Sequence, residues 1–369
     1  MNILSISVTT DTLELLWSDD VISNYPFIWL RDIDPSGFHP QTKERIFDLT
    51  SVDFDIQATS VRLTERGVEL QWPAQPQGSV FSQQLLFDYR QHCALQDPAK
   101  IDYQSWQGDF NPPRHCAEQV QQPAAMATML RDLKRYGLVI ITDLVGDHSG
   151  EQLGDLIGFK RESNFGVMFE VINKPEPNNL AYTSVSLPLH TDLPNQELPP
   201  GYQFLHCIAN EAQGGESILA DGYAIAEDLR NQNTEQFNLL SSRSMPFRFH
   251  DNNVDIRFRH KIIGLDEEQQ INSFIFNAHL AAGPDFVAGN GLEYFSAYRE
   301  LISRVRRPQY PLQLKLQAGE MMIFDNRRVL HGRKSFDPSS GKRHLRGYYI
   351  DRGEVDSRLR IIARELQSE

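Results

Sequence analysis

The chain has 369 residues, which is enough for a large core and predicts two domains. Its content of 40% hydrophobic and 23% charged residues is typical of a soluble globular protein. A net charge of −13 disfavours binding to phosphate backbones, so we expect no nucleic-acid partner. No apolar run has the length of a membrane span, and residues 1–5 do not resemble a secretory signal, so no membrane partner is expected. The few scattered cysteines, Cys93, Cys116 and Cys207, predict reduced thiols in a cytoplasmic protein.

Residues 1–90 predict a small β-rich N-terminal domain, because short alternating runs such as 12–17 are separated by turn residues. Residues 61–72 predict a hairpin within it. The proline-rich stretch 91–125 predicts a linker, which leaves residues 126–369 for the second domain.

The second domain reads as many short strands with few helices between them. A helix is expected from Pro123, which suits a first turn, to Gly137, which suits a C-terminal cap. Further helices are expected at 150–157 (with Asp147 or Ser149 as the N-cap), 224–231, 293–302 and 355–366. Strands are expected at 139–142, 202–208, 217–220, 273–275, 312–316, 321–324 and 347–350. This mainly β (α+β) pattern predicts a barrel or jelly roll rather than a doubly wound sheet.

His190 and Asp192 stand two positions apart beside a run that reads as a strand. Residues i and i+2 of a strand point to one face, so an imidazole and a carboxylate would converge. The best candidate for a third ligand is His331, far along the chain. Two histidines and one carboxylate with open positions are the ligand set of non-haem Fe(II) oxygenases. Because an isolated His-x-Asp is more often a surface or hydrogen-bonded pair, this hypothesis depends on further features.

Arg343 is a candidate anchor for a dicarboxylate that also chelates the metal. A hairpin after His331 would return Arg343 to the third ligand, and its guanidinium fork matches a carboxylate. Arg346 competes for this role, but residues three apart on a strand do not share a face. Without the metal ligands, Arg343 would read as a surface cation.

Ordered motifs extend over nearly the whole chain. They are 27–32 (FIWLRD), 178–183 (NNLAYT), 190–192 (HTD), 199–201 (PPG), 205–208 (LHCI), 214–222 (GGESILADG), 324–333 (FDNRRVLHGR), 343–345 (RHL) and 357–361 (SRLRI). In this order they resemble the γ-butyrobetaine dioxygenase family, within the 2-oxoglutarate-dependent oxygenases that include taurine dioxygenase. The resemblance implies a double-stranded β-helix (jelly-roll) catalytic domain. It is specific for the family and less so for the substrate.

The resemblance also implies a cofactor set. Fe(II) would be held by the three ligands above, and O₂ and the co-substrate 2-oxoglutarate would be consumed with release of succinate and CO₂. Arg343 matches the residue that pairs with the distal carboxylate of 2-oxoglutarate, and Ser217 and Leu205 match positions beside it. Ascorbate is the expected reductant, and a homodimer is the expected assembly.

The implied substrate is a small trimethylammonium compound, above all γ-butyrobetaine, which would give L-carnitine. The positions matching an aromatic cage for the quaternary ammonium are Phe165, Phe169, Tyr182 and Tyr349. Such a cation cannot donate hydrogen bonds but is attracted to ring faces. The positions matching the partners of the anionic end are Asn179, Leu193 and Asn277. For the phenylalanines, core packing is the alternative interpretation.

This chain departs from the family pattern at several of these positions. Phe165 and Phe169 stand where the animal enzyme has Tyr and Trp, and Leu193 replaces a tyrosine that contacts the substrate carboxylate. Trimethyllysine and a trimethylaminoethyl phosphonate therefore remain alternative substrates. Some relatives hold a structural zinc through N-terminal cysteines. Here Asp34, Ser36 and His39 occupy that region, so we expect no structural zinc.

Two other classes of function use the same residues. A zinc hydrolase could use His190, Asp192 and His331, but it would not need Arg343 and Ser217 to anchor a dicarboxylate. A non-catalytic jelly roll could bind a betaine without turnover, but it would not need all three metal positions.

Overall fold

The structure is a computed structural model that describes residues 2–73, 77–90, 97–173, 182–283 and 291–368. The chain divides into two compact units, Met1–Asp97 and Pro98–Glu369. Most of the stretch predicted as a linker therefore belongs to the second unit. The reason is local: β7 (Arg114–Cys116) pairs in parallel with β8, and Trp106 is buried.

The first unit is built from two antiparallel sheets with the strand orders β1-β2-β3 and β4-β5-β6. Alternating apolar residues on these strands form its core, which includes Leu13, Leu15, Trp17, Val68 and Leu70. Its elements are β1 Ile3–Val8, β2 Thr12–Trp17, β3 Ile22–Pro26, α1 Phe27–Asp32, the 3₁₀ turns Pro35–Gly37 and Leu49–Ser51, β4 Ser60–Thr64, β5 Gly67–Gln71, β6 Ser79–Phe81 and α2 Gln83–Asp88. The predicted 61–72 hairpin is present as β4 and β5.

Asp34 is a buried hydrogen-bond acceptor in the first unit. One of its oxygens accepts from the backbone N–H and the hydroxyl of Ser36, at 2.9 and 2.8 Å, and the other accepts from the hydroxyl of Ser79. The indole of Trp72 donates to the same Ser79 hydroxyl at 2.7 Å. Hydrogen bonds to Asp34 thus connect the 34–36 turn with β6.

The second unit contains a larger and a smaller sheet. The larger has the order β10-β21-β12-β19-β8-β7 with β9 beside β21, and the smaller has the order β11-β20-β13-β18. Except for β7 and β8, neighbouring strands are antiparallel. The strands are β8 Leu138–Thr142, β9 Lys160–Arg161, β10 Phe169–Val171, β11 Leu187–His190, β12 Tyr202–Asn210, β13 Ser217–Asp221, β18 Leu312–Leu314, β19 Met321–Asp325, β20 Val329–Arg333 and β21 Arg343–Ile350.

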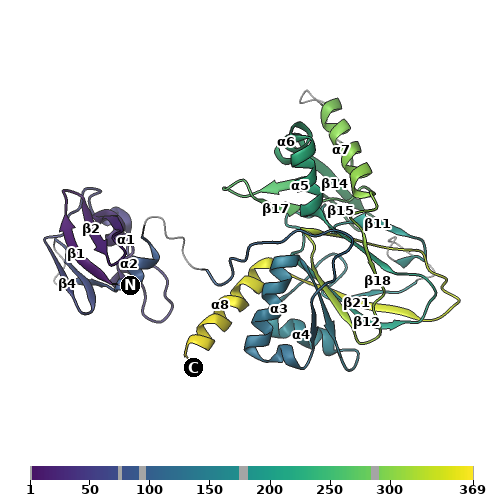
Figure 1. Ribbon diagram of the computed structural model, residues 1–369, viewed down its shortest axis with the longest axis horizontal. Coiled ribbons are helices and arrows are strands. Elements are labelled where there is room, and N and C mark those ends of the chain that lie inside the picture. Colours follow the sequence, from purple (N-terminus) through teal and green to yellow (C-terminus); the bar gives the residue numbers. More distant parts are fainter. Residues whose placement is uncertain (1, 74–76, 91–96, 174–181, 284–290, 369) are drawn as a thin grey trace. The chain divides into compact units, whose positions relative to one another are not determined.

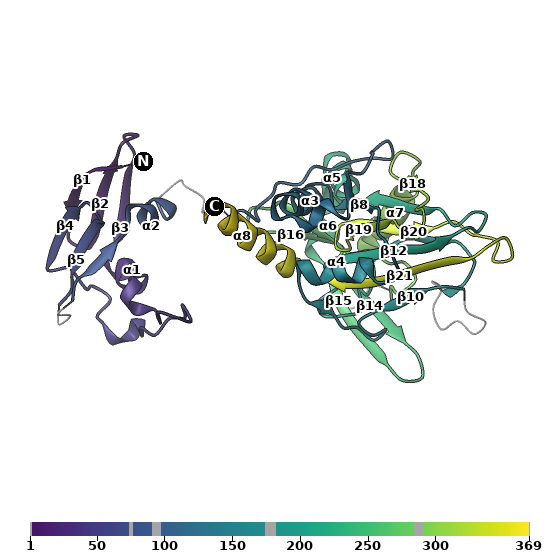
Figure 2. The same cartoon turned by 90° about the horizontal axis from the view of Figure 1, so that it is seen from below.

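Helices and two hairpins cover these sheets. Figures 1 and 2 show α3, α4 and α8 side by side, and α5, α6 and α7 in a second group. The β14–β15 hairpin projects from the unit in Figure 2. The remaining elements are the 3₁₀ turn Gln119–Gln121, α3 Pro123–Tyr136, α4 Ser149–Ile157, α5 Gly222–Gln232, α6 Thr234–Ser242, β14 Ser244–His250, β15 Asp255–Lys261, β16 Ile263–Leu265, β17 Ile271–Phe274, α7 Gly291–Val305 and α8 Arg352–Ser368. No helix among the described residues is long and apolar enough to cross a membrane.

Strand alternation separates the two faces of the larger sheet. On β12, Tyr202 and Phe204 pack with α3 and α8, whereas Gln203 and Leu205 line a cavity on the other face. Residues of the smaller sheet, such as Ser217, line the same cavity. The two sheets therefore face one another across it, as expected for a jelly roll.

The predicted termini of α3 are confirmed, while the predicted cap of α4 is wrong. Gly137 ends α3 with φ 72°, and its N–H donates to the carbonyl of Leu133 at 2.8 Å. The residue before α4 is His148, and no side chain caps the helix. Ser149 is the first residue of the helix, and its hydroxyl donates to the carbonyl of Gly146 at 2.7 Å.

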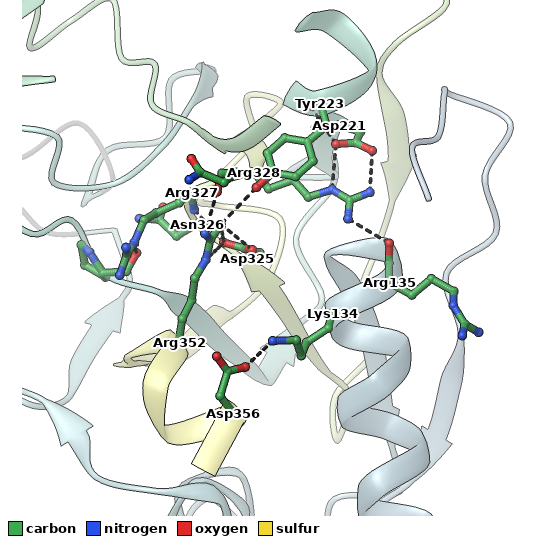
Figure 3. Close-up of polar contacts among 12 residues, drawn as sticks. Lys134, Arg135, Asp221, Tyr223, Asp325, Asn326, Arg327, Arg328, Arg352 and Asp356 are labelled. Atoms are coloured by element: carbon green, nitrogen blue, oxygen red, sulfur yellow. Dashed lines mark hydrogen bonds and ion pairs between the residues drawn. The ribbon is translucent and has the colours of Figure 1, made fainter. Parts of the chain in front are cut away.

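A buried ion pair ties α3 and β13 to the turn between β19 and β20 (Figure 3). The guanidinium of Arg328 donates to both oxygens of Asp221 at 3.0 and 2.8 Å, and also to the carbonyl of Arg135 at 2.9 Å. The side chains of Arg328 and Asp221 are 1% and 0% exposed, so neither has water as an alternative partner. The same turn places Asp325 against Arg352, whose guanidinium contacts both carboxylate oxygens at 2.8 and 2.7 Å.

Removing one member of the Arg328–Asp221 pair should destabilise the second unit strongly. Arg328→Met leaves Asp221 buried without its cation, a change that costs roughly 3–5 kcal/mol in comparable sites. Urea unfolding followed by circular dichroism measures the change. Arg257→Met, which breaks an exposed pair with Asp255, is the matched control and should leave the midpoint unchanged. Equal midpoints for both variants would contradict the structural role given to Arg328.

Candidate active site

His190 and His331 are cross-strand partners. β11 ends at His190, β20 carries His331, and the two residues lie directly opposite one another in the antiparallel register. Their ring centroids are 4.3 Å apart. Gly332 allows this close pairing, because a Cβ there would lie 2.5 Å from the carbonyl oxygen of Leu187. The pairing thus brings His331 next to His190, although the two residues are far apart in the sequence.

Asp192 reaches the two imidazoles from a turn and not from a strand. The prediction that His190 and Asp192 share a strand face is wrong, because β11 ends at His190. The chain then bends, and Leu193 has φ 53°, a left-handed conformation that costs a non-glycine residue roughly 1–3 kcal/mol. This bend, and not strand alternation, directs the Asp192 carboxylate toward the imidazoles of His190 and His331.

The donor atoms fit one metal ion. Oδ1 of Asp192 lies 3.3 Å from Nε2 of His190 and 3.5 Å from Nε2 of His331. Metal bonds of about 2.1 Å at right angles would place two ligand atoms about 3 Å apart, so small shifts suffice. Among the described residues, this is the one group of three metal-binding side chains whose ligand atoms lie within 4.8 Å of one another.

Hydrogen bonds fix which atoms face the ion. Nδ1 of His190 lies 2.8 Å from the carbonyl oxygen of Pro188, which requires the proton on Nδ1 and leaves Nε2 as a lone-pair donor. The hydroxyl of Tyr349 donates to Oδ2 of Asp192 at 2.7 Å. Oδ1 therefore remains for the metal, and Tyr349 orients the carboxylate.

Burial and neighbouring groups shift the pKa values of two candidate ligands. Burial lowers the pKa of His331, against the opposing effect of Asp192. Burial alone would raise the pKa of Asp192, but the adjacent His331 and His190 outweigh it and hold this pKa well below the ordinary value. An ionised carboxylate is the form in which aspartate binds a divalent ion.

Of the two competing arginines, Arg343 faces the cavity. β21 alternates, so Arg343, Leu345 and Tyr349 line the cavity, whereas Arg346 points away and donates to Glu170 at 2.8 Å. Nε of Arg343 is buried and has no hydrogen-bond partner among the described residues. Burial lowers the pKa of Arg343, although a guanidinium stays charged at neutral pH. This cation is therefore available to donate hydrogen bonds to the carboxylate of a ligand.

The cavity has a volume of ≈ 430 Å³ and brings together most of the predicted site residues. The described members that line it are His190, Asp192, His331, Arg343, Ser217, Leu205, Phe165, Phe169, Tyr182, Leu193, Asn277 and Tyr349. Asn179 lies outside the described residues.

Aromatic rings form part of the cavity wall. The rings of Phe169 and Tyr349 are 5.2 Å apart and tilted, and Phe165 meets Phe249 edge-on at 5.7 Å. Gly347 makes room for this wall, because a Cβ there would lie 2.4 Å from the ring of Phe169.

The side chain of Asn277 is hydrogen-bonded to the backbone of the segment that carries Asp192. Its side-chain amide donates to the carbonyl of Thr191 at 3.2 Å, and its oxygen accepts from the backbone N–H groups of His279 and Leu280 at 3.0 and 3.1 Å. The second amide hydrogen stays available to a ligand.

Several cavity residues were missed by the sequence analysis. Arg248, Phe249 and His250 come from the β14–β15 hairpin, and His279 follows Asn277. Arg333 lies on β20 beside Arg343, and burial together with that neighbouring charge lowers the pKa of Arg333 to about 10. The guanidinium of Arg333 donates to the carbonyls of Thr183 and Val185 at 2.6 and 2.8 Å. The position of Arg333, two residues after His331, is the one signal that could have indicated it.

Comparison with known proteins agrees with this geometry. Residues 112–349 match the family described as taurine catabolism dioxygenase TauD, TfdA family, and residues 4–87 match the family described as gamma-butyrobetaine hydroxylase-like, N-terminal. The chain is 36% identical to the gamma-butyrobetaine dioxygenase of Pseudomonas sp. (strain AK-1), over 95% of this chain and 94% of that protein. It is 27% identical to the mitochondrial trimethyllysine dioxygenase of Gallus gallus, over 95% of this chain and 86% of that protein.

The fold of the second unit is also found in solved structures. A taurine dioxygenase from Burkholderia xenovorans matches with a TM-score of 0.51 and 15% identity, over 68% of this chain and 90% of that one. This likeness confirms the predicted jelly-roll fold class. Together with the sequence matches, it shows that the chain belongs to the γ-butyrobetaine dioxygenase family, within the TauD, TfdA family of 2-oxoglutarate-dependent oxygenases.

Proposed function

We propose that this chain hydroxylates a small trimethylammonium acid, with the conversion of γ-butyrobetaine to L-carnitine as the first candidate reaction. One C–H bond of the substrate and O₂ are consumed with 2-oxoglutarate, giving the hydroxylated product, succinate and CO₂. The observation that carries the proposal is that one cavity holds His190, Asp192, His331, the Arg343 guanidinium and a wall of aromatic rings.

Each group has a defined task in this scheme. Fe(II) held by His190, Asp192 and His331 would supply the activation of O₂, with ascorbate as the proposed reductant. Arg343 would bind the distal carboxylate of 2-oxoglutarate, with Ser217 and Leu205 beside it. Tyr349 keeps one oxygen of Asp192 turned toward the imidazoles.

The proposed cage supports a trimethylammonium group as the cationic end of the substrate. Phe165, Phe169, Tyr182 and Tyr349 present ring faces, each worth about 0.5–2 kcal/mol to a desolvated cation. The proposed partners of the anionic end are Asn179 and Asn277, whereas Leu193 contributes only apolar contact. Trimethyllysine and a trimethylaminoethyl phosphonate are the competing substrates, because an apolar residue at 193 lacks the hydroxyl that would select a carboxylate.

The cellular setting follows from chemistry and family resemblance. We propose a cytoplasmic enzyme, because Cys116 and Cys207 are both free thiols, as a reducing compartment would keep them. A homodimer is proposed from the family resemblance alone.

A product assay with a substrate panel tests the proposed function. The purified protein is incubated with Fe(II), ascorbate, 2-oxoglutarate and γ-butyrobetaine, trimethyllysine or trimethylaminoethyl phosphonate, and succinate and hydroxylated product are quantified. We expect equimolar succinate and L-carnitine from γ-butyrobetaine, and none from the His331→Ala variant. Hydroxylation of another panel member alone would reassign the substrate. Undiminished turnover by His331→Ala would remove that residue from the metal site.

Arg343→Met should raise the KM for 2-oxoglutarate about 10- to 100-fold, because a buried charge-assisted hydrogen bond is lost. The KM for the trimethylammonium substrate should change much less. Arg346→Met is the matched control on the same strand, since Arg346 pairs with Glu170 outside the cavity. Steady-state kinetics with each substrate varied in turn measures both constants. A larger effect from Arg346→Met would exchange the roles of the two arginines.

Phe169→Ala should weaken binding of the trimethylammonium substrate about 2- to 30-fold, because one cation–π face is removed. Calorimetric titration of the substrate, with 2-oxoglutarate present under anaerobic conditions, gives the Kd. Phe295→Ala, at a partly exposed position on α7 that does not line the cavity, is the control. A neutral tert-butyl isostere of the substrate should lose less affinity than the cation. Equal losses for both ligands would mean that Phe169 provides packing only.

A further inference from the structure

Asp192 is the candidate ligand whose position regular secondary structure does not hold. His190 and His331 lie on paired strands, whereas Asp192 lies in a bend after β11, next to the left-handed residue Leu193. Tyr349 orients the carboxylate itself, whereas the backbone that carries it must be held by groups outside the bend. The contacts of this bend therefore decide where the carboxylate points.

Asn326 makes those contacts. Its side-chain oxygen accepts the backbone N–H of Asp192 at 2.7 Å, and its amide nitrogen donates to the backbone carbonyl of Asp192 at 3.1 Å. The same nitrogen lies 3.3 Å from the carbonyl of Pro200, and the backbone N–H of Asn326 donates to Gly201 at 2.8 Å. Asn326 is 0% exposed, so water does not compete for these bonds.

The turn that carries Asn326 is itself held firmly. It joins β19 to β20, the strand of His331. Asp325 is paired with Arg352 before Asn326, and Arg328 is paired with Asp221 after it. Figure 3 shows that the side chains of Asp325 and Arg328 leave this turn in different directions, toward Arg352 and Asp221. A single short turn thus connects the backbone of one candidate ligand to the strand of another.

The chemistry of the contact requires an amide. One side chain must present an acceptor to the N–H of Asp192 and a donor to its carbonyl, and only Asn or Gln offers both in this geometry. An aspartate at 326 would put a second carboxylate oxygen against the carbonyls of Asp192 and Pro200. The residue type is therefore matched to the backbone of Asp192 and not merely to a buried space.

We propose that Asn326 is a positioning residue for the metal ligand Asp192. It sets the distance between the Asp192 carboxylate and the His331 imidazole by bonding both backbone polar groups of Asp192 from the turn that leads into β20. The proposal rests on the proposed role of His190, Asp192 and His331 as metal ligands. Groups that orient metal ligands in this way typically change metal affinity about 10- to 100-fold when they are replaced.

Titration of the apo-protein with Co(II) alone tests the proposal. The Kd is obtained by calorimetry and the ligand field from the visible d–d bands, with no substrate or turnover required. We expect tight binding by the unaltered chain. Asn326→Ala and Asn326→Asp should bind Co(II) about 10- to 100-fold more weakly and show altered d–d bands. Circular dichroism verifies that each variant is folded at the titration temperature.

The control is Arg304→Met on α7, because Arg304 is a buried arginine that donates to Gln232 at 2.9 Å and does not line the cavity. This change should lower thermal stability while Co(II) affinity stays within about twofold of the unaltered chain. Unchanged Co(II) affinity in both folded Asn326 variants would overturn the proposal, as would an equal loss in Arg304→Met. If Asn326→Asp does not fold, Asn326→Ser, whose hydroxyl is too short to bridge both groups, takes its place. Failure of the unaltered chain to bind Co(II) would instead refute the metal site itself.

Discussion

The two imidazoles meet because His190 of β11 lies opposite His331 of β20, just after a shift in the strand register between Leu187 and His190. A slip of one residue would turn His331 to the opposite face of its sheet, where it could not approach His190. Gly332 makes this pairing possible, since any larger residue would collide with the backbone of β11. Ser217 reaches the same cavity through a second pairing, that of β13 with β20, which sets Ser217 opposite Arg333.

Burial strengthens the preference of the charged groups in the cavity for ligand groups of opposite charge. The Asp192 carboxylate, whose pKa is held well below its ordinary value, favours a cation at one place. The Arg343 guanidinium, whose Nε has no hydrogen-bond partner among the described residues, favours an anion at another. In a buried site of low polarity these preferences are stronger than in water. In the function proposed above, the same low polarity would favour contact between a quaternary ammonium and the rings of Phe169 and Tyr349.

The periodicity of apolar and polar residues correctly predicted several structural elements of this protein. The apolar spacing of α3 and its terminal Pro123 and Gly137 located the helix, and alternation along β21 separated Arg343 from Arg346. Three predictions needed correction: the linker, the N-cap of α4 and the strand position of Asp192. The last two were inferred from residue type at a chain position. A local hydrogen bond from Ser149 to Gly146 accompanies the start of α4, whereas contacts with a distant turn hold the backbone of Asp192.

Residue chemistry and spacing were therefore sufficient for the fold class, and they selected candidate metal ligands and a candidate dicarboxylate anchor that line one cavity. They could not supply the register of β11 against β20, the support of Asp192 by Asn326, or the contributions of Phe249, His279 and Gly347 to the cavity. Those features depend on contacts between segments far apart in the chain. Such contacts leave no periodic pattern in either segment alone, so they became visible only once the chain was folded.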